Sequence, residues 1–102
     1  MDRYIRAQHK GFAFAQLQAH TSHDGGDGLG EDVGGVCACT SVAELRSNTV
    51  MGALGPDDEV VVFEGVHLSS IYDGERVRPV REIARFTVAD LYQRPELIGE
   101  EI

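Results

Sequence analysis

Residue types suited to chemistry are most concentrated in the segment 20–35, which reads HTSHDGGDGLGEDVGG. This segment holds six of the twelve glycines of the chain and contains neither lysine nor arginine. Carboxylate oxygens are ligands that Ca²⁺ prefers, and glycines allow a backbone to fold closely around a cation. The segment is therefore a candidate site for a divalent cation, with its oxygen ligands at Asp24, Asp27, Glu31 and Asp32.

The spacing of these carboxylates departs from the common calcium motifs. The D-x-[DN]-x-[DN]-G pattern of the EF-hand is absent, and a single GGDG is not the repeated nonapeptide of a calcium-binding β-helix. The simpler interpretation is a flexible, acidic, glycine-rich loop over 20–35. Structureless loops of this length are usually either functional or disordered, and the sequence leaves both interpretations open.

A second set of reactive groups consists of His20 and His23, followed by Cys37 and Cys39. Zinc prefers four such ligands in a tetrahedron, and a thiol beside a histidine is the minimal pair for nucleophilic catalysis. However, Cys-x-Cys is not the usual chelating Cys-x-x-Cys turn, and no nucleophile-elbow motif accompanies it. On a strand both thiols would share one face, and we expect them to pack as small hydrophobic groups.

A local cluster of basic residues follows in the C-terminal half. Four of the nine basic residues fall within ten positions, at Arg76, Arg78, Arg81 and Arg85. Their guanidinium groups could bind phosphates or carboxylates of a ligand or partner, and Glu64 and His67 are further candidates for such binding. The alternative that we favour is pairing within the chain, across a hairpin, with glutamates at 59, 64, 75 and 82, each pair contributing roughly 0.2–1 kcal/mol.

The elements that would position these groups follow from periodicity and turn residues. Before the acidic segment we expect strands over 4–8 and 12–19, joined by a Lys10-Gly11 turn, and after it a strand over 36–40. Ser41 and Glu44 form a predicted capping box, which starts a helix that ends at Gly55-Pro56.

The remaining pattern predicts a long hairpin. The EVVVFE run at 59–64 is typical of a strand buried on both faces, and Gly65 allows a bulge. The Asp73-Gly74 pair predicts a hairpin turn, followed by a returning strand over 77–86 that Pro79 favours as an edge. Thr87 and Asp90 predict a second cap, for a short helix that ends at Arg94-Pro95, and we expect a loosely held tail over 96–102.

Together these elements predict a single α+β domain over 1–102. We expect an antiparallel sheet of about four to six strands, with one three-turn helix packed on one face and a short C-terminal helix. The net charge of −8 opposes binding to nucleic acid or to anionic membranes. We also find no apolar run long enough to span a bilayer and no signal peptide, and two cysteines cannot build a disulfide framework, so we expect a cytoplasmic location.

The leading functional hypothesis is a small, soluble, non-enzymatic interaction module that self-associates as a homodimer through an edge strand near 77–86. One alternative is an acidic inhibitor or nucleic-acid mimic that presents Asp57, Asp58 and Glu59, with the carboxylates of 20–35, to a basic protein. Another is a metal-dependent ligand-binding protein or minor enzyme that uses His20, His23, Cys37 or Glu64.

Overall fold

The computed structural model describes residues 2–19, 35–71 and 74–98. Its element order is β1 (Asp2–Gln8), α1 (Phe14–Ala19), β2 (Val36–Ala38), α2 (Val42–Arg46), the 3₁₀ helix η1 (Thr49–Ala53), β3 (Glu59–Ile71), β4 (Gly74–Thr87), α3 (Val88–Gln93) and α4 (Pro95–Ile98). The α+β class is confirmed. No helix within the described ranges is long and apolar enough to cross a membrane.

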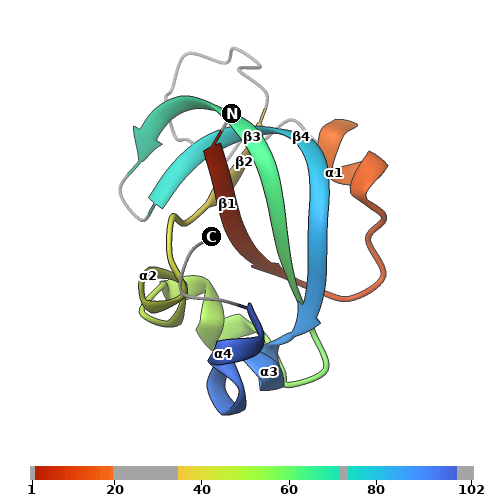
Figure 1. Cartoon of the computed structure of the whole chain (residues 1–102), viewed down its shortest axis with the longest axis vertical. Coiled ribbons are helices and arrows are strands. Elements are labelled where there is room, and N and C mark those ends of the chain that lie inside the picture. Colours follow the sequence, from red (N-terminus) through yellow and green to blue (C-terminus); the bar gives the residue numbers. More distant parts are fainter. Residues whose placement is uncertain (1, 20–34, 72–73, 99–102) are drawn as a thin grey trace.

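The four strands form one antiparallel sheet in the order β1-β3-β4-β2. The long β3–β4 hairpin shifts register at three places, one of them between Glu64 and Gly65, where a bulge was expected. Bulges bend strands and increase their twist, so the hairpin arches over the rest of the sheet (Figure 1). An isolated antiparallel bridge between Ile5 and Cys39 brings the chain after β2 against β1, and the sheet thereby curls towards closure.

Both faces of the curled sheet are buried, as the EVVVFE run of β3 predicts. Val60 and Val62 belong to one hydrophobic cluster, which the helices α2, α3 and α4 cover at one end of the molecule (Figure 1). Val61 and Phe63 point to the opposite face and pack in a second cluster with residues of β2, β4 and α1. The molecule therefore has two small cores that share β3.

The expected three-turn helix after Ser41 is not confirmed. The Ser41 side chain does accept a hydrogen bond from the Glu44 N–H (3.1 Å), but α2 ends at Arg46. Asn48 then starts a separate 3₁₀ helix, because its side-chain oxygen accepts a hydrogen bond from the Val50 N–H (2.9 Å). A residue that can cap a new helix competes with continuation of the old one, and here the new helix prevails.

The strand predicted over 12–19 is wrong, since Phe14–Ala19 is the helix α1. Alanine, glutamine and leucine are good helix formers, and the Gln16 side-chain oxygen accepts a hydrogen bond from the Ala13 N–H (2.7 Å). Among residues 14–18, whose burial the structure describes, only Leu17 is buried, so one side chain and not an alternating face anchors this segment.

The predictions for the C-terminal half of the chain are confirmed for the hairpin and for the cap of α3. The hairpin is confirmed because Ile71 pairs with Gly74, although Tyr72 and Asp73 lie outside the described residues. Thr87 and Asp90 form a reciprocal capping box at the start of α3, and Arg94 ends that helix. The loosely held tail is wrong for its first part, because Ile98 of α4 is buried in the core.

Candidate functional site

A pocket of about 260 Å³ lies where the end of β1 faces α1 and η1. Most of its lining is apolar, and four larger side chains provide it: Phe12, Leu17, Val50 and Leu54. Of these four side chains, Phe12 and Val50 are 46% and 39% exposed. The pocket therefore presents apolar surface that solvent reaches.

Three separate elements hold this apolar wall in place. Leu17 anchors α1 in the core, while the Asn48 cap fixes the start of η1 and so the position of Val50. The segment that carries Phe12 is tied to β4, because Arg85 Nη1 donates a hydrogen bond to the Phe12 carbonyl (2.7 Å).

The polar part of the wall comes from β1. Arg6 Nε donates to Gln8 Oε1 (3.0 Å), and Arg6 Nη1 donates to the Cys37 carbonyl of β2 (2.9 Å). An arginine side chain has only donors, so the oxygen of the Gln8 amide must be the atom that faces Arg6. Gln8 is 5% exposed, and its Nε2 group has no hydrogen-bond partner in the described part of the chain.

Asp58 secures the turn that follows β1. Its carboxylate accepts hydrogen bonds from the Gly55 N–H (2.8 Å) and the Lys10 N–H (3.1 Å), and His9 Nδ1 lies 3.4 Å away. The bond from Gly55, then the bond from Lys10 and the neighbouring His9, hold the pKa of Asp58 below its usual value. His9 lines the pocket, so Asp58 stabilises both sides of the pocket mouth.

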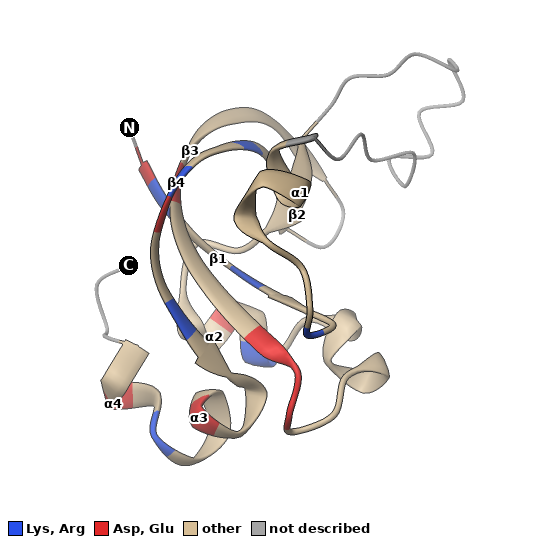
Figure 2. Ribbon diagram, turned by 90° about the vertical axis from the view of Figure 1, so that its right-hand side faces the viewer, with Lys and Arg blue, Asp and Glu red and all other residues tan. Residues whose placement is uncertain are grey.

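Two of the four arginines in the basic cluster, Arg81 and Arg85, pair with glutamates within the hairpin, as expected. Arg81 binds Glu64 through Nε (2.8 Å) and Nη2 (2.7 Å). Arg85 binds Glu82 (2.6 Å) and also pairs with Glu59 on β3. Basic and acidic positions consequently interleave along the ribbon and form no continuous basic stripe over the described residues (Figure 2).

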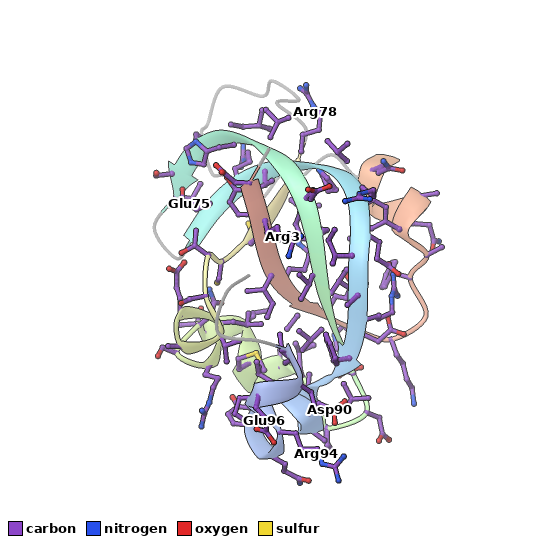
Figure 3. All side chains as sticks on the ribbon, viewed as in Figure 1. Arg3, Glu75, Arg78, Asp90, Arg94 and Glu96 are labelled. Atoms are coloured by element: carbon purple, nitrogen blue, oxygen red, sulfur yellow. The ribbon has the colours of Figure 1, made fainter. Side chains whose placement is uncertain are left out.

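The other candidates of this group lie in different environments. His67 is exposed and bonds Glu75 (2.8 Å), which, with a bond from Ser70, lowers the pKa of the Glu75 carboxyl. Arg78 extends away from the body of the molecule into solvent (Figure 3). Arg76 is 5% exposed, because β2 pairs beside it, and its Nε atom has no partner among the described groups.

The structure does not test the acidic segment. Six predicted metal ligands lie outside the described residues, namely His20, His23, Asp24, Asp27, Glu31 and Asp32. Within the described ranges there is no group of three or more His, Cys, Asp or Glu that could hold a metal ion. Cys39 is buried in the core as expected, with Asn48 Nδ2 3.6 Å from its sulfur, and Cys37 is half-buried.

The pocket residues were not among those predicted for a site. In the sequence, Arg6 and Gln8 alternate with Ile5 and Ala7, which predicts that the two polar side chains face solvent. The sequence offered one signal of a polar group near a pocket, namely that a glutamine, Gln8, occurs within a strand of a small sheet. This signal indicates a buried polar side chain only once it is known that other elements cover the second face of β1.

Comparisons of the chain with protein-family models, with curated proteins and with solved structures find no match. The function is therefore argued from the geometry of the pocket.

Proposed function

We propose that this chain is a small non-enzymatic binding domain, and that the pocket between β1, α1 and η1 is its binding site. The observation that carries this proposal is a concave, mostly apolar pocket with a few fixed polar groups. This combination is the usual pattern of small-molecule sites, whose volumes start at about 300 Å³. The pocket is slightly smaller, so it suits a ligand of modest size.

Binding without catalysis is favoured by the groups that line the pocket. The described lining contains no serine, threonine or cysteine to serve as a nucleophile. His9 contacts Asp58 at the mouth, but its side chain faces solvent for most of its surface. The remaining polar groups are the amides of Gln8 and Gln16 and the guanidinium of Arg6, which can orient a ligand by hydrogen bonds.

A fragment screen followed by amide chemical shifts in ¹⁵N-labelled protein tests the proposal. We expect fragment-induced shifts to cluster at Phe12, Leu17, Val50 and Leu54. Ala53 also lines the pocket, so Ala53→Phe should fill it and weaken binding about tenfold or more. Ala43→Phe, on the exposed surface of α2, is the matched control and should leave binding unchanged. Absence of any pocket-directed fragment, or equal binding by both variants, would contradict the proposal.

A second candidate function is self-association, for which the β3–β4 hairpin offers support. Val66 and Val80 are 43% and 40% exposed on neighbouring strands, beside side chains of both charges at Arg78 and Glu64. A two-fold symmetric contact needs such a self-complementary patch. The sheet edge itself is less available than expected, because Gln18 of α1 donates a hydrogen bond to the Val80 carbonyl (3.1 Å).

Light scattering after size exclusion tests self-association. We expect a homodimer that Val66→Lys converts to a monomer, since a buried unpaired charge is costly in an interface. Leu97→Lys, at an exposed position of α4, is the control and should stay dimeric. A wild-type monomer at millimolar concentration would remove this candidate.

A further inference from the structure

Phe12 is a large aromatic residue that lies outside both cores. The rings of Tyr4 and Phe14 each pack against the ring of Phe63 in the second core, with centroids 6.2 and 6.1 Å away. Phe12 belongs to neither hydrophobic cluster, and within the described part of the chain its ring contacts no other aromatic ring. It remains nearly half exposed and lines the pocket, so a molecule in the pocket can reach its ring.

The main chain that carries Phe12 is tied to two other segments, although the residue itself is exposed. The Lys10 N–H donates a hydrogen bond to the Asp58 carboxylate (3.1 Å), and Arg85 Nη1 donates one to the Phe12 carbonyl (2.7 Å). A phenylalanine side chain has only two rotatable bonds, so ordering its ring against a ligand costs little conformational entropy. Phe12 thus offers an aromatic surface in a largely fixed place.

The other large apolar groups of the pocket wall are aliphatic, namely Leu17, Val50 and Leu54. Such groups favour saturated and aromatic ligands about equally, because their gain follows the apolar area that is removed from water. Two aromatic rings gain in addition, because their quadrupoles favour offset or edge-to-face packing. Phe12 is the only residue with a benzene ring in the described lining, so it decides between aromatic and saturated ligands of the same shape.

The volume of the pocket limits the size of the ligand. An apolar cavity of about 150 Å³ is sufficient to bind benzene in a protein. The pocket measures about 260 Å³, which leaves room for one six-membered ring with a short substituent.

We infer that the ligand is a small molecule built on a single aromatic ring, and that this ring packs against the ring of Phe12. This inference rests on the proposed function, since it names the ligand class of the same pocket. It also assigns Phe12 as a specificity-determining residue.

Two matched pairs of neutral probes test the ligand class: phenol against cyclohexanol, and benzyl alcohol against cyclohexylmethanol. The members of a pair share their hydroxyl group and their number of carbon atoms, and they differ in the aromatic ring. We expect dissociation constants from amide chemical shifts to be about threefold to tenfold lower for the aromatic member of each pair. Equal or tighter binding of the saturated members would overturn the inference and leave the proposed function intact.

Two variants of Phe12 test the assigned ring contact. Phe12→Leu removes the ring but keeps an apolar side chain, so the aromatic preference should disappear while the saturated probes still bind. Phe12→Tyr keeps the ring and should keep the preference. Both variants should fold, because Phe12 is exposed and belongs to neither core.

Tyr92→Leu is the matched control for the loss of a ring. Tyr92 on α3 is 45% exposed, nearly the same as Phe12, and it is not among the residues that line the pocket. This variant should show the aromatic preference of the wild type.

The outcomes separate the two proposals. An unchanged preference in Phe12→Leu would overturn the assignment of Phe12. Failure of all four probes, while other fragments enter the pocket, would overturn the inference alone. If no fragment of any kind enters the pocket, the proposed function fails together with the inference.

Discussion

Ile5 and Cys39 exchange two backbone hydrogen bonds, from Ile5 N–H to the Cys39 carbonyl (2.9 Å) and from Cys39 N–H to the Ile5 carbonyl (2.7 Å). These two hydrogen bonds link β1 to the residue that directly follows β2. In the sheet order β1-β3-β4-β2, β1 and β2 are the two outer strands. A flat four-stranded sheet would keep these strands far apart. Their contact means that the sheet is curled, and the curling encloses the second core around Phe63.

This bridge predicts a difference in reactivity between the two cysteines. Cys39 is 2% exposed and Cys37 is half-buried, so a reagent reaches the Cys39 thiol only when the bridge region opens. We expect the thiol of Cys39 to react about tenfold or more slowly than that of Cys37, because local opening limits access to buried groups. Ellman's reagent with the single-thiol variants Cys37→Ala and Cys39→Ala measures this. Equal rates in the two variants would show that the bridge does not protect Cys39.

The bend in the hairpin predicts that Gly65 cannot accept a side chain. A Cβ atom at this position would overlap Val77 Cγ1 and lie 2.8 Å from the Arg78 carbonyl oxygen. We expect Gly65→Ala to lower the free energy of unfolding by about 1–3 kcal/mol, as overpacking does in a well-packed core. Urea unfolding measures the change.

Gly52 provides the matched control for this substitution. No atom lies within 4 Å of a Cβ built at Gly52, and the residue sits in the exposed part of η1. Gly52→Ala should be neutral or stabilise the protein by up to about 1 kcal/mol, because it restricts the unfolded chain. A similar loss in both variants would mean that the effect is not caused by crowding at Gly65.

The strands and caps were predictable because their signals are local. The apolar run of β3 and the hydroxyl–carboxylate spacing of Thr87 and Asp90 each act within a few residues. The single helix expected after Ser41 could not be resolved in the same way. Asn48 could either continue that helix or cap a new one, and packing of Met51 and Leu54 against the core decides between the two.

The pocket was beyond prediction for a different reason. Alternation along β1 distinguishes its two faces, and Ile5 and Ala7 lie together in one core. It cannot show that the sheet curls and covers the other face as well. Arg6 and Gln8 therefore resemble solvent-facing residues in the sequence, and their neighbours in the fold, Cys37 for Arg6 and Glu59 for Gln8, lie far along the chain.

The capping box of α3 predicts a measurable contribution from one hydroxyl. Thr87 Oγ1 accepts a hydrogen bond from the Asp90 N–H (3.1 Å), which no helical carbonyl-to-amide bond could otherwise satisfy. We expect Thr87→Ala to destabilise the protein by about 1 kcal/mol in urea unfolding. Thr87→Ser keeps the hydroxyl and should recover most of this loss. A serine variant as unstable as the alanine variant would show that packing of the methyl group, and not the cap, is responsible.

The bonds to Asp58 predict a specific dependence of stability on acid pH. Its pKa in the folded protein lies below the unfolded value of about 3.9, chiefly because the Gly55 N–H bonds the ionised carboxylate. A group with a depressed pKa stabilises the fold above its unfolded pKa, and this stabilisation is lost as the pH falls through the folded pKa. We therefore expect Asp58→Asn to be less stable than the wild type near neutral pH. The difference should shrink steadily as the pH falls below about 4.

Urea midpoints at constant ionic strength, measured from about pH 7 down to about pH 2.5, give this difference directly. Other carboxylates titrate over the same range, so the informative quantity is the gap between variant and wild type and not the slope of either. Asp57→Asn removes the neighbouring exposed carboxylate and changes the net charge by the same amount. This variant is the control for the change in net charge. A parallel profile for Asp58→Asn would show that the carboxylate is not held by the Gly55 and Lys10 amides, and that the turn beside the pocket is secured in another way.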